Sequence, residues 1–295
     1  MSQVTSPSSS RAYGLARVAR VWGVSRATIY RHRHVSPAKP CRPGSVGPMP
    51  DEALVAAIRG VLTASAFHGE GYRKVWARLR FAGVRTSRRR VLRLMHEHSL
   101  GAHQRTGRTR GPRSHNGTIT TEQVDTMWGT DLTSVMTGEG LASVFIAVDH
   151  CSAECVGIHA ARRATRFEAL EPIRQGVREH FGGFGKGVAA GLMLRHDHGS
   201  QYISDAFQRE IAFLGMTSSP AFVRAPEGNG CAERFIRTLK ENLLWVRDIE
   251  TVEELRLALL EFRQRYNETW ILERHGYRTP AAIRAAQIRP AAQAA

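Results

Sequence analysis

Residues 126–149 read TMWGTDLTSVMTGEGLASVFIAVD, in which two runs rich in apolar and β-branched residues flank a Gly-containing turn. The runs 126–136 and 141–149 predict two strands joined by a turn, and residues 154–159 predict a third strand in the same meander. Asp131 stands in the middle of the first run. A carboxylate in such a strand costs free energy unless its charge is compensated, and a divalent cation is one compensator. Asp131 is therefore a candidate site residue.

Helices and strands should alternate further along the chain. The spacing of apolar residues predicts helices at 166–181, 204–214 and 229–245, with short strands at 192–195 and 216–219. A meander followed by alternating helices and strands predicts an α/β fold, in which helices flank a mixed sheet.

Two more acids lie at the ends of these elements. Asp197 follows the strand 192–195 in the segment DHGSQY (197–202), and Glu233 lies in NGCAE (229–233), on the first turns of the last core helix. Three acids from two neighbouring strands and a helix form a set of oxygen donors that suits two Mg²⁺ ions. His196 and His198 flank Asp197, and we expect them to orient it or to contact phosphates.

Several motifs together resemble one family. The set WGTD (128–131), DHGSQY (197–202) and NGCAE (229–233), with 35 residues between Asp197 and Glu233, resembles the DDE insertion-sequence transposases with a retroviral-integrase-type core. The later Tyr266-Asn267 and Thr279-Pro280 pairs are similar to the C-terminal signatures of that group, and GYR (71–73) and RLM (93–95) to its helical domain. The resemblance covers about residues 51–285.

This resemblance implies an RNase H-like fold and Mg²⁺-dependent (or Mn²⁺-dependent) transfer of DNA 3′ ends, with two ions per active site. Asp131, Asp197 and Glu233 are then the catalytic, metal-binding acids. Asp149 is the best rival to Asp131, although a strand-end acid is more simply a turn residue. Glu227 and Glu241 are weaker rivals to Glu233. The zinc site that precedes retroviral integrase cores is not expected, because residues 1–120 contain one cysteine, Cys41.

Charge is distributed unevenly along the chain. Residues 1–120 hold 22 Lys and Arg against four acids, a net charge of +18, whereas residues 121–295 have a net charge of −2. Twenty of those 22 cations are arginine, which makes bidentate contacts with phosphate and guanine. A basic front segment followed by a balanced one predicts a nucleic-acid-binding module, rather than only a soluble basic surface, ahead of a region with a second role.

Two helical units are expected in the basic segment. In the first, Gly23 supplies a turn and Ser25 caps the following helix, which is typical of a helix-turn-helix, although an ordinary helical hairpin remains an alternative. In the second, Asp51 and Ser87 are expected to cap helices. The predicted DNA contacts are Arg26, Thr28 and Arg31 in the first unit and Arg88, Arg89, Arg90 and Arg93 in the second.

The whole chain then divides into six predicted parts. These are a helix-turn-helix (11–34), a Pro-rich linker (35–50), a second helical DNA-binding domain (51–100), a basic connector (101–122), the RNase H-like integrase catalytic core (123–246) and a C-terminal helical extension (247–295). In the last core helix, Arg237 and Lys240 follow Glu233 at helical spacing and share its face, so both are predicted to grip DNA.

Other classes of protein fit the sequence less well. Four scattered cysteines argue against a disulfide-stapled secreted domain, and no apolar run approaches the roughly 20 residues that span a bilayer. We therefore expect a cytoplasmic, nucleoid-associated protein that binds double-stranded DNA and forms a homo-oligomer when DNA ends are brought together. The alternatives are a catalytically inactive DNA-binding regulator derived from such an element and an RNase H-like nuclease that lacks strand transfer.

Overall fold

The computed structural model describes residues 4–33, 49–102, 119–221 and 229–293. The chain forms two compact units, Met1–Met49 and Pro50–Ala295, which are described separately. None of the helices in these described ranges is both long and apolar enough to cross a membrane.

The first unit contains helices α1 (Gly14–Val21) and α2 (Arg26–Arg33). Gly23 adopts a φ of +64° between them, a conformation that costs glycine little. The Ser25 hydroxyl accepts a hydrogen bond from the Thr28 backbone N–H at 3.1 Å. The predicted turn and cap are therefore confirmed. The predicted linker at 35–50 lies mostly outside the described residues.

The second unit begins with three helices, α3 (Asp51–Ala64), α4 (Tyr72–Phe81) and α5 (Arg88–Glu97). Ser87 caps α5 by accepting a hydrogen bond from the Arg90 backbone N–H, as predicted. The predicted cap at Asp51 is wrong, because Pro50 precedes the helix and Asp51 is its first residue. The carboxylate of Asp51 instead binds Arg90 and Arg93 of α5, which ties the two ends of the helical unit together.

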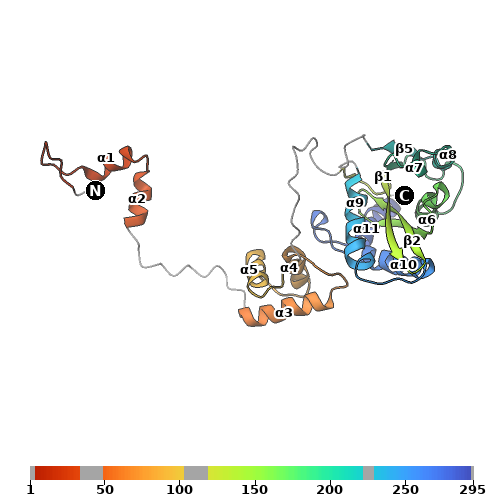
Figure 1. The fold of residues 1–295 in the computed structure, drawn as a ribbon, viewed down its shortest axis with the longest axis horizontal. Coiled ribbons are helices and arrows are strands. Elements are labelled where there is room, and N and C mark those ends of the chain that lie inside the picture. Colours follow the sequence, from red (N-terminus) through yellow and green to blue (C-terminus); the bar gives the residue numbers. More distant parts are fainter. Residues whose placement is uncertain (1–3, 34–48, 103–118, 222–228, 294–295) are drawn as a thin grey trace. The chain divides into compact units, whose positions relative to one another are not determined.

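A five-stranded mixed sheet follows, in the order β3-β2-β1-β4-β5 (Figure 1). β1 pairs antiparallel with β2, and β2 with β3, which confirms the meander, while β4 and β5 add in parallel. The β1–β4 pairing ends at Gly129 and Arg195. The strands are β1 (Met127–Thr137), β2 (Gly140–Asp149), β3 (Cys155–Ala161), β4 (Met193–His196) and β5 (Thr217–Pro220).

Two hydrophobic layers cover the sheet. Helices α6 (Arg166–His180), α7 (Ser200–Ile203) and α8 (Asp205–Phe213) pack over Trp128 on one face. Helices α9 (Gly230–Leu239) and α10 (Val252–Thr269) pack over Ile146 on the other, on the opposite side of β1 and β2 in Figure 1. Because side chains alternate along a strand, Asp131 points to the face opposite Trp128 and is aligned with Ile146. It therefore faces the layer that contains α9.

The last core helix is not continuous. The predicted helix at 229–245 changes at Lys240 into a π-helix (η2, Lys240–Leu244). Asn242 in this segment donates a hydrogen bond to the Thr238 carbonyl and accepts one from the His68 backbone N–H at 2.7 Å. The neighbouring Phe67 packs edge-on against Phe262 of α10. The three-helix unit thus contacts the helices that cover the sheet.

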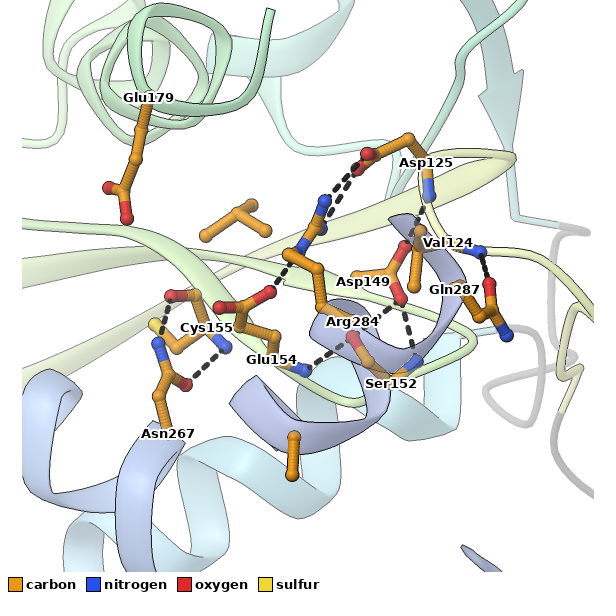
Figure 2. Close-up of polar contacts among 12 residues, drawn as sticks. Val124, Asp125, Asp149, Ser152, Glu154, Cys155, Glu179, Asn267, Arg284 and Gln287 are labelled. Atoms are coloured by element: carbon orange, nitrogen blue, oxygen red, sulfur yellow. Dashed lines mark hydrogen bonds and ion pairs between the residues drawn. The ribbon is translucent and has the colours of Figure 1, made fainter. Parts of the chain in front are cut away.

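The C-terminal segment continues through η3 (Glu273–His275) and α11 (Pro280–Gln293) and is bound to the sheet by buried polar contacts (Figure 2). Arg284 of α11 binds Asp125, just before β1, with N–O distances of 2.6 and 2.9 Å, and also Glu154 before β3. Asn267 of α10 donates to and accepts from the backbone of Cys155. Residues beyond 246 therefore complete the core.

Candidate active site

Asp131 extends from β1 toward the α9 side of the sheet. One carboxylate oxygen accepts a hydrogen bond from the Leu132 backbone N–H at 2.8 Å. The pKa of Asp131 is raised to about 6, chiefly by burial. The Leu132 hydrogen bond and the charge of Lys240 lower it, whereas the negative charges of Asp197 and Glu233 raise it. The charges of both other predicted acids therefore affect the pKa of Asp131.

Asp197 lies directly after β4 and is exposed. Its Oδ1 accepts a hydrogen bond from the Gly199 backbone N–H at 2.8 Å, and a Cβ at Gly199 would lie 2.9 Å from that same oxygen. The ring of His196 is buried and contacts the Asp197 backbone carbonyl, while its Nε2 contacts Ser218. His196 is thus placed to orient the Asp197 segment. The other role expected for it, a contact with phosphates, does not fit its burial.

Glu233 lies in the first turn of α9 and is exposed. The preceding Asn229 is buried and donates a hydrogen bond from its side-chain amide to the Thr130 carbonyl at 2.9 Å. Thr130 is the residue before Asp131, and Glu233 follows Asn229 by one helical turn. This hydrogen bond from the Asn229 amide therefore holds the start of α9 against β1, close to the acid that each element carries.

The donor set suits a hard divalent cation. All three side chains offer carboxylate oxygens, and mutual repulsion among them is relieved when a cation binds. Across the described ranges, however, no three His, Cys, Asp or Glu side chains are gathered closely enough to hold a metal ion as they stand. The three acids thus share one electrostatic environment without forming a closed cage.

The rival acids occupy other environments. Asp149 is fully buried, and its Oδ1 accepts hydrogen bonds from the backbone and hydroxyl of Ser152, while its Oδ2 accepts one from the Asp125 backbone N–H. This confirms its interpretation as a turn residue. Glu241 lies in the π-helix, and Glu227 lies outside the described residues.

The cations of α9 have different exposures. Arg237 is exposed and Lys240 is half-buried. The charge of Lys240 lowers the pKa of Asp131.

The arginines of α5 have partners within the protein. Arg90 binds Asp51 with its Nε at 2.7 Å, and Arg93 binds both Asp51 and Glu97. Arg88 stacks over Trp76 and lies 3.7 Å from a Glu273 oxygen, whereas Arg89 is exposed. In α2, Arg26 is exposed and Thr28 is half-buried, and the side chain of Arg31 is outside what the structure describes.

Two family models match the parts of the chain that carry these features. An HTH-like domain matches residues 50–108, and an integrase core domain matches residues 214–280, which include Glu233. The chain is similar to insertion-sequence transposases. The transposase InsD for insertion element IS2A/D/F/H/I/K of Escherichia coli is 25% identical over 292 residues, or 92% of this chain and 91% of InsD.

Two further similarities are to another insertion-element protein and to a solved structure. The 48.2 kDa protein of insertion element IS2A from Escherichia coli is 25% identical over 295 residues, and the match covers 93% of this chain but only 65% of that protein. Among solved structures, the catalytic core domain of BIV integrase is 20% identical, with a TM-score of 0.43, and the match covers 56% of this chain and 97% of that domain.

Sequence reasoning did not identify the contact that joins β1 to α9. Gly129 lies in the WGTD segment, and a Cβ there would lie 2.5 Å from Asn229 Oδ1 and 2.7 Å from His150 Nε2. Only glycine leaves room for the Asn229 side chain. The signal was present in the two motifs, WGTD and NGCAE, but the contact joins residues 100 positions apart in the chain.

Proposed function

We propose that this chain is a DDE transposase that cleaves DNA at the 3′ ends of an insertion sequence and joins them to target DNA. The single observation that carries the proposal is the shared environment of Asp131, Asp197 and Glu233, in which the charges of the latter two raise the pKa of Asp131. Similarity to insertion-sequence transposases and the match to an integrase core domain support the same reaction class.

The three acids would hold two Mg²⁺ or Mn²⁺ ions. When bound, the ions supply the Lewis acidity that activates a water or 3′-hydroxyl group and stabilises the departing oxygen. Asp197 is pre-oriented for this role, because the Gly199 N–H occupies one lone pair of its Oδ1 and leaves Oδ2 available for a ligand. Asp131 is held in the same way by the Leu132 N–H.

The DNA strand that is cut should run along α9. The charge of Lys240, the first residue of η2, lowers the pKa of Asp131, and Arg237 lies one turn earlier in α9. Two cations beside an acidic metal site would bind the phosphates that flank the scissile bond. Their proposed role is to position the strand, whereas the acids carry the chemistry.

The helical units would also bind DNA. Arg26, Thr28 and Arg31 of α2 are the proposed contacts of the first unit, and Arg89, which is exposed on α5, is a proposed contact of the second. Arg88, Arg90 and Arg93 would have to exchange their present acidic partners for phosphates. Arg90, with a side chain only 16% exposed, is the least suited to that exchange.

The proposed reaction needs two DNA ends, so the proposed partners are double-stranded DNA and further copies of this chain. Such a protein acts where chromosomal DNA lies, and we propose that it works in the cytoplasm, at the nucleoid.

An end-joining assay tests the proposal. The full chain is incubated with a labelled duplex taken from the DNA that flanks its gene, together with a supercoiled plasmid and Mg²⁺. We expect nicking at the element's 3′ end followed by transfer of label to the plasmid, and neither product without the divalent ion. Binding of the duplex without cleavage in Mg²⁺ or Mn²⁺ would instead support the inactive regulator.

A further inference from the structure

The contact between Asn229 and β1 lies beside the proposed acids and is not one of them. Asn229 is the residue just before α9, a position where an Asn side chain commonly caps the helix. Here the side chain makes no capping hydrogen bond. Its amide instead donates to the Thr130 carbonyl at 2.9 Å. The Asn229 side chain therefore binds β1 and does not cap the helix.

The position of the acceptor explains that use. Strand β4 pairs with β1 only as far as Gly129, so the Thr130 carbonyl lies just past the last β1–β4 pair. A buried carbonyl that is left without a hydrogen-bond donor destabilises the fold. Asn229 supplies a donor where the neighbouring strand stops, and so substitutes for the missing ladder bond.

Glycine at position 129 makes this contact sterically possible. A Cβ there would lie 2.5 Å from Asn229 Oδ1, a distance that van der Waals repulsion forbids. A side chain at 129 would therefore displace the Asn229 amide from its present position, together with the His150 ring, whose Nε2 would lie 2.7 Å from that Cβ.

We propose that Asn229 is a positioning residue, which, with Gly129, sets the separation of Asp131 and Glu233 at the metal site. Asp131 is one residue from the acceptor carbonyl, and Glu233 is one helical turn, about 6 Å of rise, from the donor. Like charges on β1 and α9 repel, and the hydrogen bond resists their separation before any cation binds. The inference rests on the proposed function, because it concerns the metal site of that reaction.

A second buried asparagine provides a matched control. Asn267 also joins a helix to a strand, since its side chain donates to and accepts from the backbone of Cys155. Both asparagines are buried, at 6% and 8% exposure. Asn267, however, lies on α10 and contacts β3, and neither of these elements carries one of the three acids. Asn→Leu at either position keeps the branched shape of the side chain, with larger end groups, and removes the amide donor.

The test compares Asn229→Leu, Gly129→Ala and Asn267→Leu with the full-length protein. Mn²⁺ affinity is measured by the loss of the free-ion EPR signal, thermal midpoint by calorimetry, and DNA cleavage as a function of Mn²⁺ concentration. We expect Asn229→Leu and Gly129→Ala to weaken Mn²⁺ binding at least tenfold, and excess Mn²⁺ to recover most of the cleavage rate. Asn267→Leu should lower the thermal midpoint and leave Mn²⁺ affinity within twofold.

The outcomes separate this inference from the proposed function. Asp197→Asn is the reference, because it should lose Mn²⁺ binding that excess ion does not restore. If Asn229→Leu and Gly129→Ala both bind Mn²⁺ as wild type does, or if Asn267→Leu loses as much affinity as they do, Asn229 is an ordinary structural contact. If wild type and Asp197→Asn bind Mn²⁺ equally weakly, the metal site itself is wrong.

Discussion

Two groups of three acids lie on or beside the same sheet and are treated differently by the protein. Asp125, Asp149 and Glu154 are compensated by the protein itself, through Arg284 and the donors of the Ser152 turn (Figure 2). In the other group, burial raises the pKa of Asp131, and the negative charges of Asp197 and Glu233 add to that rise. Acids that the protein neutralises hold the fold together, whereas acids that accumulate charge are suited to an external cation.

The largest effect should come from the second group. Asp197→Asn keeps the side-chain shape and removes a charge that holds metal, so cleavage and joining should fall on the order of 10³-fold or more. Thermal stability should stay unchanged or rise, because repulsion with Asp131 is relieved. Cleavage rate, duplex affinity and thermal midpoint measured on one preparation check this prediction. Asp205→Asn, an exposed acid at the start of α8, is the control. A cleavage rate near that of wild type would remove Asp197 from the site.

The opposite result is expected in the first group. Arg284→Met leaves Glu154 and Asp125 without their cation, and burial already raises the pKa of Glu154. Breaking a buried ion pair by removing one partner costs about 3–5 kcal/mol. Urea unfolding should show this loss.

Adding Glu154→Gln and Asp125→Asn to Arg284→Met should recover part of the stability, because the uncompensated charges are then gone. A loss below about 1 kcal/mol in the single variant would contradict a structural role for the network.

A buried cation tests the same effect of burial on a group of the opposite charge. Lys74 of α4 lies over the ring of Trp270, and burial lowers its pKa from 10.5 to about 7. The unfolded chain keeps the higher pKa, so between pH 7 and 10.5 unfolding takes up a proton and stability should rise with pH. The slope contributed by one such group is at most about 1.4 kcal/mol per pH unit.

Unfolding free energies of wild type and Lys74→Met at pH 7, 8 and 9 check this prediction. The difference between the two proteins should shift in favour of wild type as pH increases. Parallel stability curves would show that the Trp270 ring keeps Lys74 charged at the higher pH.

The smallest effect on stability should be at Lys240. Lys240 is half-buried, and ion pairs at partly exposed positions contribute about 0–1 kcal/mol. Lys240→Ala should therefore leave the thermal midpoint almost unchanged but weaken binding of the element end or slow joining several-fold. Lys186→Ala, at an exposed lysine before β4, is the control. Equal DNA binding and joining in the two variants would assign Lys240 to the solvated surface.

Local patterns predicted most of the core elements. The meander, the helix α6 and the short strands β4 and β5 follow from the periodicity of apolar residues, which is a property of the local sequence. The π-helix at Lys240–Leu244 was not predicted, and its Asn242 binds the backbone of His68, a residue 174 positions away that periodicity does not connect to it. The partners of the α5 arginines were missed for the same reason: Asp51 was expected to cap a helix and instead binds Arg90 and Arg93.

The sequence alone determined which residues are candidates for chemistry, since the acids in WGTD, DHGSQY and NGCAE stand out by residue type and spacing. Tertiary structure decided which acids are neutralised. Arg284 reaches Asp125 across 159 positions, and Asn229 reaches Thr130 across 99. Neither contact leaves a local pattern, because hydrogen bonds between distant residues depend on how strands and helices pack, and periodicity records only which face of an element is apolar.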